Sequence, residues 1–148
     1  MNSRVAVYTL FILALTGMGL VLAWVAIRFA TPQPEYVEIG QLSDFPPSRE
    51  PYFVNDPRPL FVLNYNDALL VLDPLNQVPG GAPVRWQTHE QTYVDPNRGT
   101  FFDRYGNPTR HPTHDDYPVE KQSLLRYPVS FRGDRIIIEA SRPVLNTP

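Results

Sequence analysis

One cluster of side chains in this sequence suits a metal ion, and it lies between positions 111 and 116. It reads His111-Pro112-Thr113-His114-Asp115-Asp116. Imidazole and carboxylate groups are donors that zinc and other divalent ions accept. However, a solvated polar loop explains the same composition, and the proline after His111 constrains the geometry. We therefore predict no metal site, and keep a metal-binding function of His111 and His114 as an alternative.

Other arrangements that support catalysis are missing. Ser123 and Ser130 have no adjacent histidine and carboxylate to activate them. His89 and Glu90 fall where a polar turn is expected, and residues 79–82 do not lead from a strand into a helix as a phosphate-binding loop does. The chain has no cysteine, which excludes disulfides, thiolate metal sites and cysteine nucleophiles. We predict that the protein is not an enzyme.

The N-terminal region predicts a membrane anchor. Residues 5–27 carry no charge and are bounded by Arg4 and Arg28. As a helix this run spans about 34 Å, enough to cross a hydrocarbon core of roughly 30 Å. It is too long for the apolar region of a cleaved signal peptide. Because Arg4 lies before the helix and acidic residues follow it, we expect a single-pass membrane protein with a cytoplasmic N-terminus and the rest on the periplasmic side.

Small residues recur along one face of this predicted helix, at spacings of three and four. They are Thr16, Gly19, Ala23, Ala26 and Ala30. Small side chains let another helix approach closely in lipid. We therefore expect the partners to be the lipid bilayer and integral membrane subunits. A net charge of −2, from 13 basic and 15 acidic residues, argues against a nucleic-acid partner.

The chain after position 30 contains all 17 prolines and shows no helical period of apolar residues. Short strand-like runs occur instead, at residues 36–39, 52–55, 60–64, 68–72, 91–94, 124–130 and 135–139. Turn residues at 64–67 and 132–134 predict two hairpins. The fold class is therefore all-β, a small antiparallel sandwich or barrel. Its core is expected to contain the aromatic residues Phe53, Phe61, Trp86, Phe101, Phe102, Tyr127 and Phe131.

Together these features predict five segments. They are a short N-terminus (1–4), an anchor helix (5–30), a proline-rich linker (31–35), a β domain (36–140) and a C-terminal tail (141–148).

The segment from Val84 to Pro108 resembles the core of a Rieske iron–sulfur domain. In that family a strand with a basic residue and tryptophan leads to a loop of the form C-P-C-H-G-S, followed by an aromatic-Asp pair and a turn. The corresponding pieces here are Val84-Arg85-Trp86, Asp95-Pro96-Asn97-Arg98-Gly99-Thr100, Phe102-Asp103 and Tyr105-Gly106-Asn107-Pro108. The family's other ligand loop, C-T-H-L-G-C, matches residues 77–82. The resemblance extends over residues 36–139 and, with the anchor, is closest to the membrane-tethered Rieske subunits.

The resemblance implies that every cluster ligand has been replaced. A Rieske centre is held by two cysteines and two histidines. The cysteine positions are Gln77 and Asp95, and the histidine positions are Pro79 and Arg98. The loop disulfide of the tethered subunits would fall on Ala82 and Asn97. Proline offers no donor side chain and arginine brings a fixed positive charge, so we expect no cofactor.

Two further expectations follow. Asp95 and Arg98 are three residues apart in one tight loop. They are expected to form an ion pair that holds this loop closed in place of the cluster. The protein is expected to be a non-catalytic accessory subunit of a respiratory or photosynthetic electron-transfer complex, which stabilises redox subunits or shapes their docking surface. The alternative is a membrane-tethered extracytoplasmic binding module.

Overall fold

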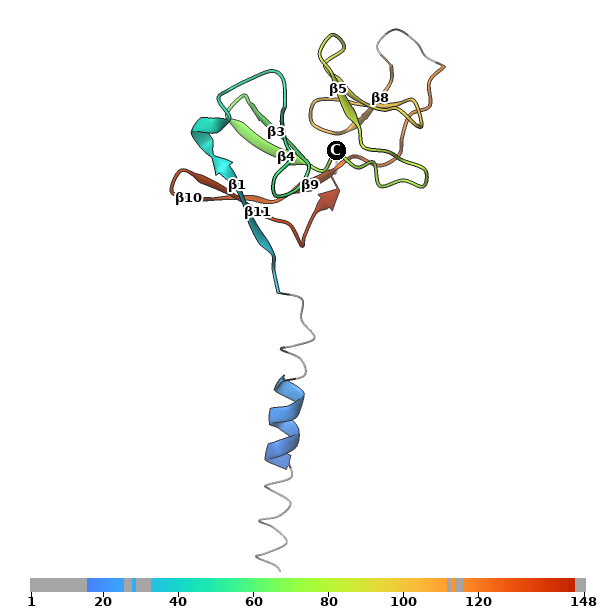
Figure 1. Cartoon of the computed structure of the whole chain (residues 1–148). Helices are drawn as coiled ribbons and strands as arrows, with labels where there is room; N and C mark the ends of the chain where they lie inside the picture. The colour runs from blue at the N-terminus through green and yellow to red at the C-terminus, as the bar shows by residue number, and fades with distance from the viewer. Residues whose placement is uncertain (1–15, 26–27, 29–32, 112, 114–115, 146–148) are drawn as a thin grey trace, which may run out of the picture. The chain divides into compact units, whose positions relative to one another are not determined.

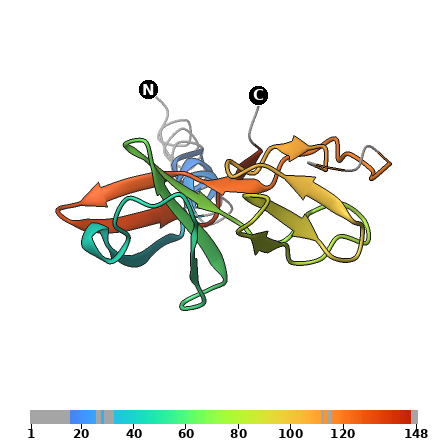
Figure 2. The ribbon, with the colours of Figure 1, turned by 90° about the horizontal axis from the view of Figure 1, so that it is seen from above.

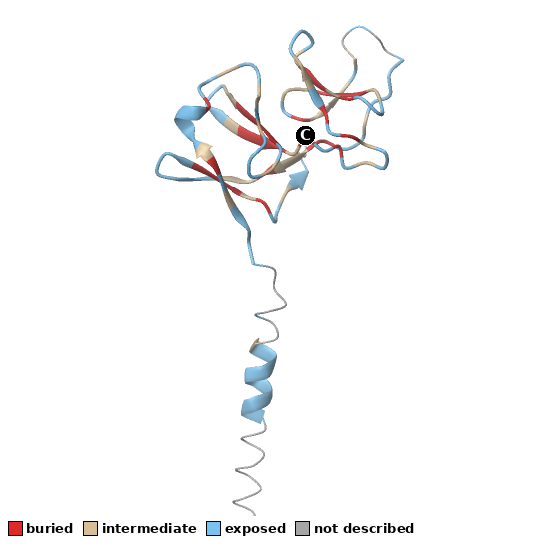
Figure 3. Ribbon diagram, in the orientation of Figure 1, coloured by how far each residue is buried: buried red, intermediate tan, exposed pale blue. Residues whose placement is uncertain are grey.

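The computed structural model describes residues 16–25, 28, 33–111, 113 and 116–145. It separates into two units, residues 1–33 and residues 34–148, and each is considered by itself. In the first unit, residues 16–25 are helical, and residues 16–24 are exposed (Figure 3). Within the described residues, no helix combines the length and the apolar character needed to span a membrane.

The predicted anchor lies largely outside the described residues, so it stays a prediction. Thr16, Gly19 and Ala23 fall in the described helix. Ala26 and Ala30 lie outside the described residues, as do residues 1–4.

The second unit is built from three antiparallel sheets (Figure 1). The three-stranded sheet has the order β1-β11-β10, and the five-stranded sheet the order β12-β9-β4-β3-β2. Their bounds are β1 Tyr36–Gln41, β2 Tyr52–Val54, β3 Leu60–Tyr65, β4 Ala68–Leu72, β9 Leu125–Tyr127, β10 Val129–Arg132, β11 Arg135–Glu139 and β12 Val144–Leu145. A short 3-10 helix, η1 (Leu42–Asp44), follows β1.

The four-stranded sheet, β5-β6-β7-β8, is formed entirely by residues 85–109. Its strands are β5 Arg85–Gln87, β6 Thr92–Asp95, β7 Thr100–Phe102 and β8 Pro108–Thr109. Seen from above, this sheet and the β10–β11 hairpin lie at opposite ends of the unit (Figure 2). The predicted all-β class of antiparallel sheets is confirmed.

The two predicted hairpins form where the turn residues allow them. Tyr65 pairs with Ala68, so Asn66 and Asp67 alone make the turn, with φ of 51° and 59°. Asparagine and aspartate tolerate this left-handed region, which a two-residue turn that matches strand twist requires. In the second hairpin Arg132 pairs with Arg135.

The five-stranded sheet is buried on both faces by two apolar clusters. On β3, Leu60 and Val62 belong to the first core, while Phe61 and Leu63 belong to the second. Successive side chains of a strand point to opposite faces, so an uninterrupted apolar run is what a strand with two covered faces needs. The first core joins this sheet to Ile136 and Ile138 of β11, and the second joins it to residues of the four-stranded sheet. The second-core residues there are Tyr93 and Phe102, together with Val84 directly before β5.

Three sequence predictions differ from the structure. The run 124–130 is not one strand, because Pro128 separates β9, which pairs with β4, from β10, which pairs with β11. The expected tail contains β12, which pairs with β9 and so carries the sheet beyond residue 140. Among the aromatic residues, Phe53 and Phe131 are not core: they are 58% and 54% exposed, and each lies on a strand at the edge of its sheet, β2 and β10.

Candidate functional site

The candidate site is formed by two loops at one end of the four-stranded sheet. The first loop is residues 76–82, which precede β5, and the second loop is residues 95–100, which connect β6 to β7. These loops contain the four positions, Gln77, Pro79, Asp95 and Arg98, that the sequence resemblance predicts to match Rieske cluster ligands. The structure brings the two loops together through direct hydrogen bonds.

Asp95 is the centre of this contact, because its fully buried carboxylate accepts four hydrogen bonds. Its Oδ2 accepts from Asn76 Nδ2 at 2.8 Å and from the Ala82 amide at 3.1 Å, both in the first loop. Its Oδ1 accepts from the amides of Asn97 and Arg98, at 2.8 and 3.2 Å. One carboxylate therefore binds the first loop and shapes the second.

The hydrogen bonds also decide the ionisation of this carboxyl group. Burial alone would raise the pKa of Asp95, because it disfavours the charged form. The bonds from Asn76 and from the amides of Ala82, Asn97 and Arg98 act in the opposite direction, and the pKa of Asp95 is lowered below its ordinary value. Asp95 is thus an anion held in the interior.

The predicted ion pair between Asp95 and Arg98 is wrong. Arg98 contacts Asp95 through its backbone amide, and its guanidinium turns to other partners. Nε donates to Glu120 Oε1 at 2.6 Å, and one terminal nitrogen donates to the Pro79 carbonyl oxygen at 2.9 Å. The side chain points away because Asp95 is already saturated by closer donors. Arg98 therefore links the second loop both to the first loop and to the segment that contains Glu120.

His111 packs in an aromatic cluster next to the second loop. Its ring lies edge-on to Phe101, with centroids 4.5 Å apart, and stacks on Tyr117 at 4.9 Å. Its Nδ1 accepts a hydrogen bond from the Thr113 amide at 3.1 Å. His114 lies outside the described residues. Among those that are described, no group of three or more metal-ligating side chains occurs.

The donor set of the two loops does not fit an iron–sulfur cluster. Gln77 is exposed and donates to the Leu75 carbonyl oxygen at 3.3 Å. Pro79 has no donor side chain, and Arg98 carries a positive charge that would repel an iron ion. Asp95, the one anionic candidate, already accepts four hydrogen bonds. What the arrangement provides is a junction between two loops that is closed by hydrogen bonds.

Two members of this network, Asn76 and Glu120, were not identified from the sequence. Asn76 lies 19 residues before its partner Asp95, and Glu120 lies 22 residues after its partner Arg98. Neither belongs to a spaced motif, so no local signal singles them out. His89 and Glu90 lie in the exposed turn between β5 and β6, as predicted.

The Arg98–Glu120 pair is expected to contribute modestly to stability. Its charge-assisted bond is short, but the Arg98 side chain is 39% exposed, and water screens pairs of this kind. Arg98→Gln and Glu120→Gln should each lower the free energy of unfolding by about 0.5–1 kcal/mol. In a double-mutant cycle the pair of substitutions should cost little more than either alone. Strict additivity in urea unfolding would show that the two side chains do not interact.

Comparisons with known proteins find similarity to solved structures. No protein-family model matches the chain, and no curated protein matches it. Among solved structures it is similar to the ferredoxin of carbazole 1,9a-dioxygenase from Nocardioides aromaticivorans IC177. The two are 20% identical, with a TM-score of 0.42, and the similarity covers 70% of this chain and 95% of that one.

Proposed function

We propose that this chain is a non-catalytic accessory subunit of a membrane electron-transfer complex, with a Rieske-like domain that has lost its cluster. It would be held by one N-terminal helix, with its β domain on the periplasmic side. There it would stabilise neighbouring redox subunits or shape the surface on which a soluble carrier docks. The domain itself moves no electrons in this proposal.

One observation carries the proposal: the loops that would hold a cluster are closed by hydrogen bonds. Asp95 joins the first loop through Asn76 and Ala82, and Arg98 joins it through Pro79. A loop pair that needs no metal to stay closed keeps the fold while the redox chemistry is lost. Further support comes from the sequence resemblance to tethered Rieske subunits, which are themselves parts of such complexes.

The test is purification of the tagged full-length chain from its native membranes in mild detergent. We expect integral membrane subunits with redox cofactors to co-migrate with it. The isolated chain is expected to carry no stoichiometric iron and to give no electron paramagnetic resonance signal of a reduced Rieske centre. Migration as a lone monomer would contradict the accessory role, and stoichiometric iron would contradict the loss of the cluster.

Two matched variants of the helix refine this test. Ala23→Leu enlarges a residue of the small-residue face, where close helix packing leaves no room for a larger side chain. Val21→Leu makes a smaller change off that face. Co-purification should fall for Ala23→Leu and persist for Val21→Leu; equal recovery with both would contradict helix packing through this face.

A further inference from the structure

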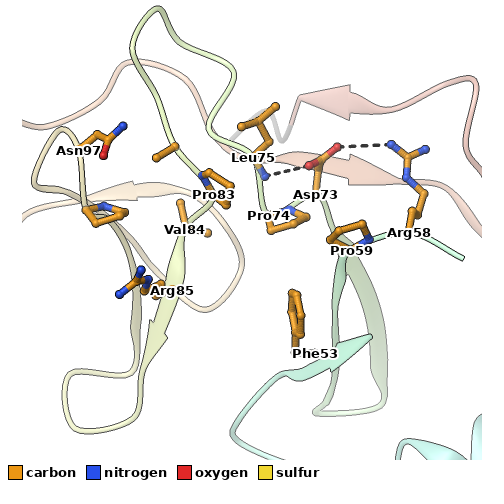
Figure 4. A pocket seen from close by; sticks show the side chains of 12 residues that line it. Phe53, Arg58, Pro59, Asp73, Pro74, Leu75, Pro83, Val84, Arg85 and Asn97 are labelled. Carbon is orange, nitrogen blue, oxygen red and sulfur yellow. Dashed lines mark hydrogen bonds and ion pairs between the residues drawn. The ribbon is translucent and has the colours of Figure 1, made fainter. Parts of the chain in front are cut away.

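A cleft of about 660 Å³ lies between the five-stranded and the four-stranded sheets (Figure 4). Phe53 of β2 lies on one side, and Val84 and Arg85, at the start of β5, lie on the other. The cleft adjoins the Asp95 network, because Ala82 and Asn97 line the cleft and also donate backbone hydrogen bonds to Asp95. Its volume falls within the range of sites that bind small organic molecules.

The walls of the cleft are apolar and rigid. Four prolines line it, and they come from three different connections: Pro59, Pro74, Pro83 and Pro96. A proline ring offers apolar surface without an amide donor, and its fixed φ limits movement of the wall. The centroids of the Phe53 and Phe61 rings lie 5.2 Å apart, so Phe53 packs on Phe61 while remaining 58% exposed. Such a preformed surface suits a flat apolar group, because little ordering accompanies binding.

The charged residues of the cleft carry an excess of positive charge. Arg58 and Arg85 line it together with a single acidic residue, Asp73. Asp73 is occupied: it accepts from the Leu75 amide at 2.8 Å and from the Tyr127 hydroxyl at 2.6 Å, and it lies 3.9 Å from the Arg58 guanidinium. Arg85 is exposed and has no ion-pair partner in the described part of the chain. Arg85 is therefore the cation available to a ligand.

A second apolar cleft allows a comparison, because it lacks the positive charge found in the first. It has a volume of about 750 Å³ and is lined by Leu42, Pro46, Leu69, Val129 and Phe131 among others. No arginine or lysine lines it, and its one charged residue is Asp67. Of these two apolar clefts of similar size, the one between the sheets combines apolar walls with an available cation.

We propose that the cleft between the sheets binds a small organic carboxylate with a flat apolar body. The apolar body lies against Phe53 and the proline rings, and the carboxylate pairs with the guanidinium of Arg85. A guanidinium is suited to this because it presents two parallel donors to one carboxylate. This proposal does not depend on the accessory role argued above.

The test compares two probes of the same shape, 1-naphthaleneacetate and the neutral 1-naphthaleneacetamide. Each is titrated into the full chain in one detergent, and amide chemical shifts locate and quantify binding. We expect shifts that centre on Phe53 and Val84, and an affinity for the acid about fivefold above that for the amide, as one exposed charge pair provides. Arg85→Gln should abolish this preference. Phe53→Ala should lower the affinity for both probes and leave the ratio of the two affinities unchanged.

Arg132→Gln is the matched control, since Arg132 is an exposed arginine that does not line this cleft. It should leave both affinities as in the parent protein. Unshifted amides elsewhere will show that each variant is folded. The proposal is overturned if acid and amide bind equally, if both arginine variants reduce the preference alike, or if the shifts centre on Leu69 and Phe131 in the second cleft.

Discussion

Asp95→Ala is expected to lower the free energy of unfolding by about 3–5 kcal/mol, because it removes a buried charge and four hydrogen bonds. The carboxylate is fully buried and accepts four hydrogen bonds. Alanine leaves the donors of Asn76 and Ala82 buried without an acceptor and opens the junction between the two loops. Urea unfolding of the full chain, followed by the fluorescence of its tryptophans, measures the loss.

Asp116→Ala is the control for this substitution. Asp116 is exposed, so its replacement should change the free energy of unfolding by no more than about 0.5 kcal/mol. If the two alanine variants were equally stable, Asp95 would not hold the loops together.

The same carboxylate makes stability depend on pH. Its pKa in the folded chain lies below the ordinary value of 3.8. The unfolded state therefore binds the proton more readily, and the stabilisation from Asp95 is complete above that value and is lost as the pH falls below it. Asp95→Asn removes this contribution, so between pH 5 and pH 3 its stability should fall less steeply than that of the parent chain. Parallel curves would contradict the lowered pKa.

Gly81→Ala is expected to destabilise the chain by about 3 kcal/mol, the cost of forcing extra volume into a packed site. A Cβ at position 81 would lie 2.3 Å from the Asn76 carbonyl oxygen and 3.0 Å from that of Val78. Both atoms belong to the backbone, so the first loop must shift as a whole. That shift would move Asn76 and Ala82 away from Asp95. Thermal unfolding of the full chain provides the measurement.

The neighbouring glycine is the matched control. Gly80 has φ of 78°, but no atom lies within 4 Å of the position that a Cβ would occupy. Gly80→Ala should therefore cost only about 1 kcal/mol, from the left-handed backbone. Equal losses at the two positions would mean that the close approach to Asn76 does not restrict position 81.

Much of the β fold could be predicted because its signals are local. Asn66 and Asp67 tolerate positive φ, so they allow a two-residue turn between two apolar runs. The apolar runs of β3 and β4 predicted strands, and the structure shows that two apolar clusters cover the two faces of these strands. The brief strands β7, β8 and β12 have two or three residues each, too few for a periodic pattern, and only their pairing defines them.

The sequence by itself determined the chemistry that the two loops lack. Without cysteine, no arrangement of these residues supplies the two thiolates of a Rieske centre. Only the tertiary structure decided what the remaining side chains do: Asp95 bonds to residues 13 and 19 positions earlier, and Arg98 to one 22 positions later. The cleft beside Phe53 likewise exists only because two sheets meet. Residue types are a property of the chain, whereas contacts between distant loops depend on how the sheets pack and bring those loops together.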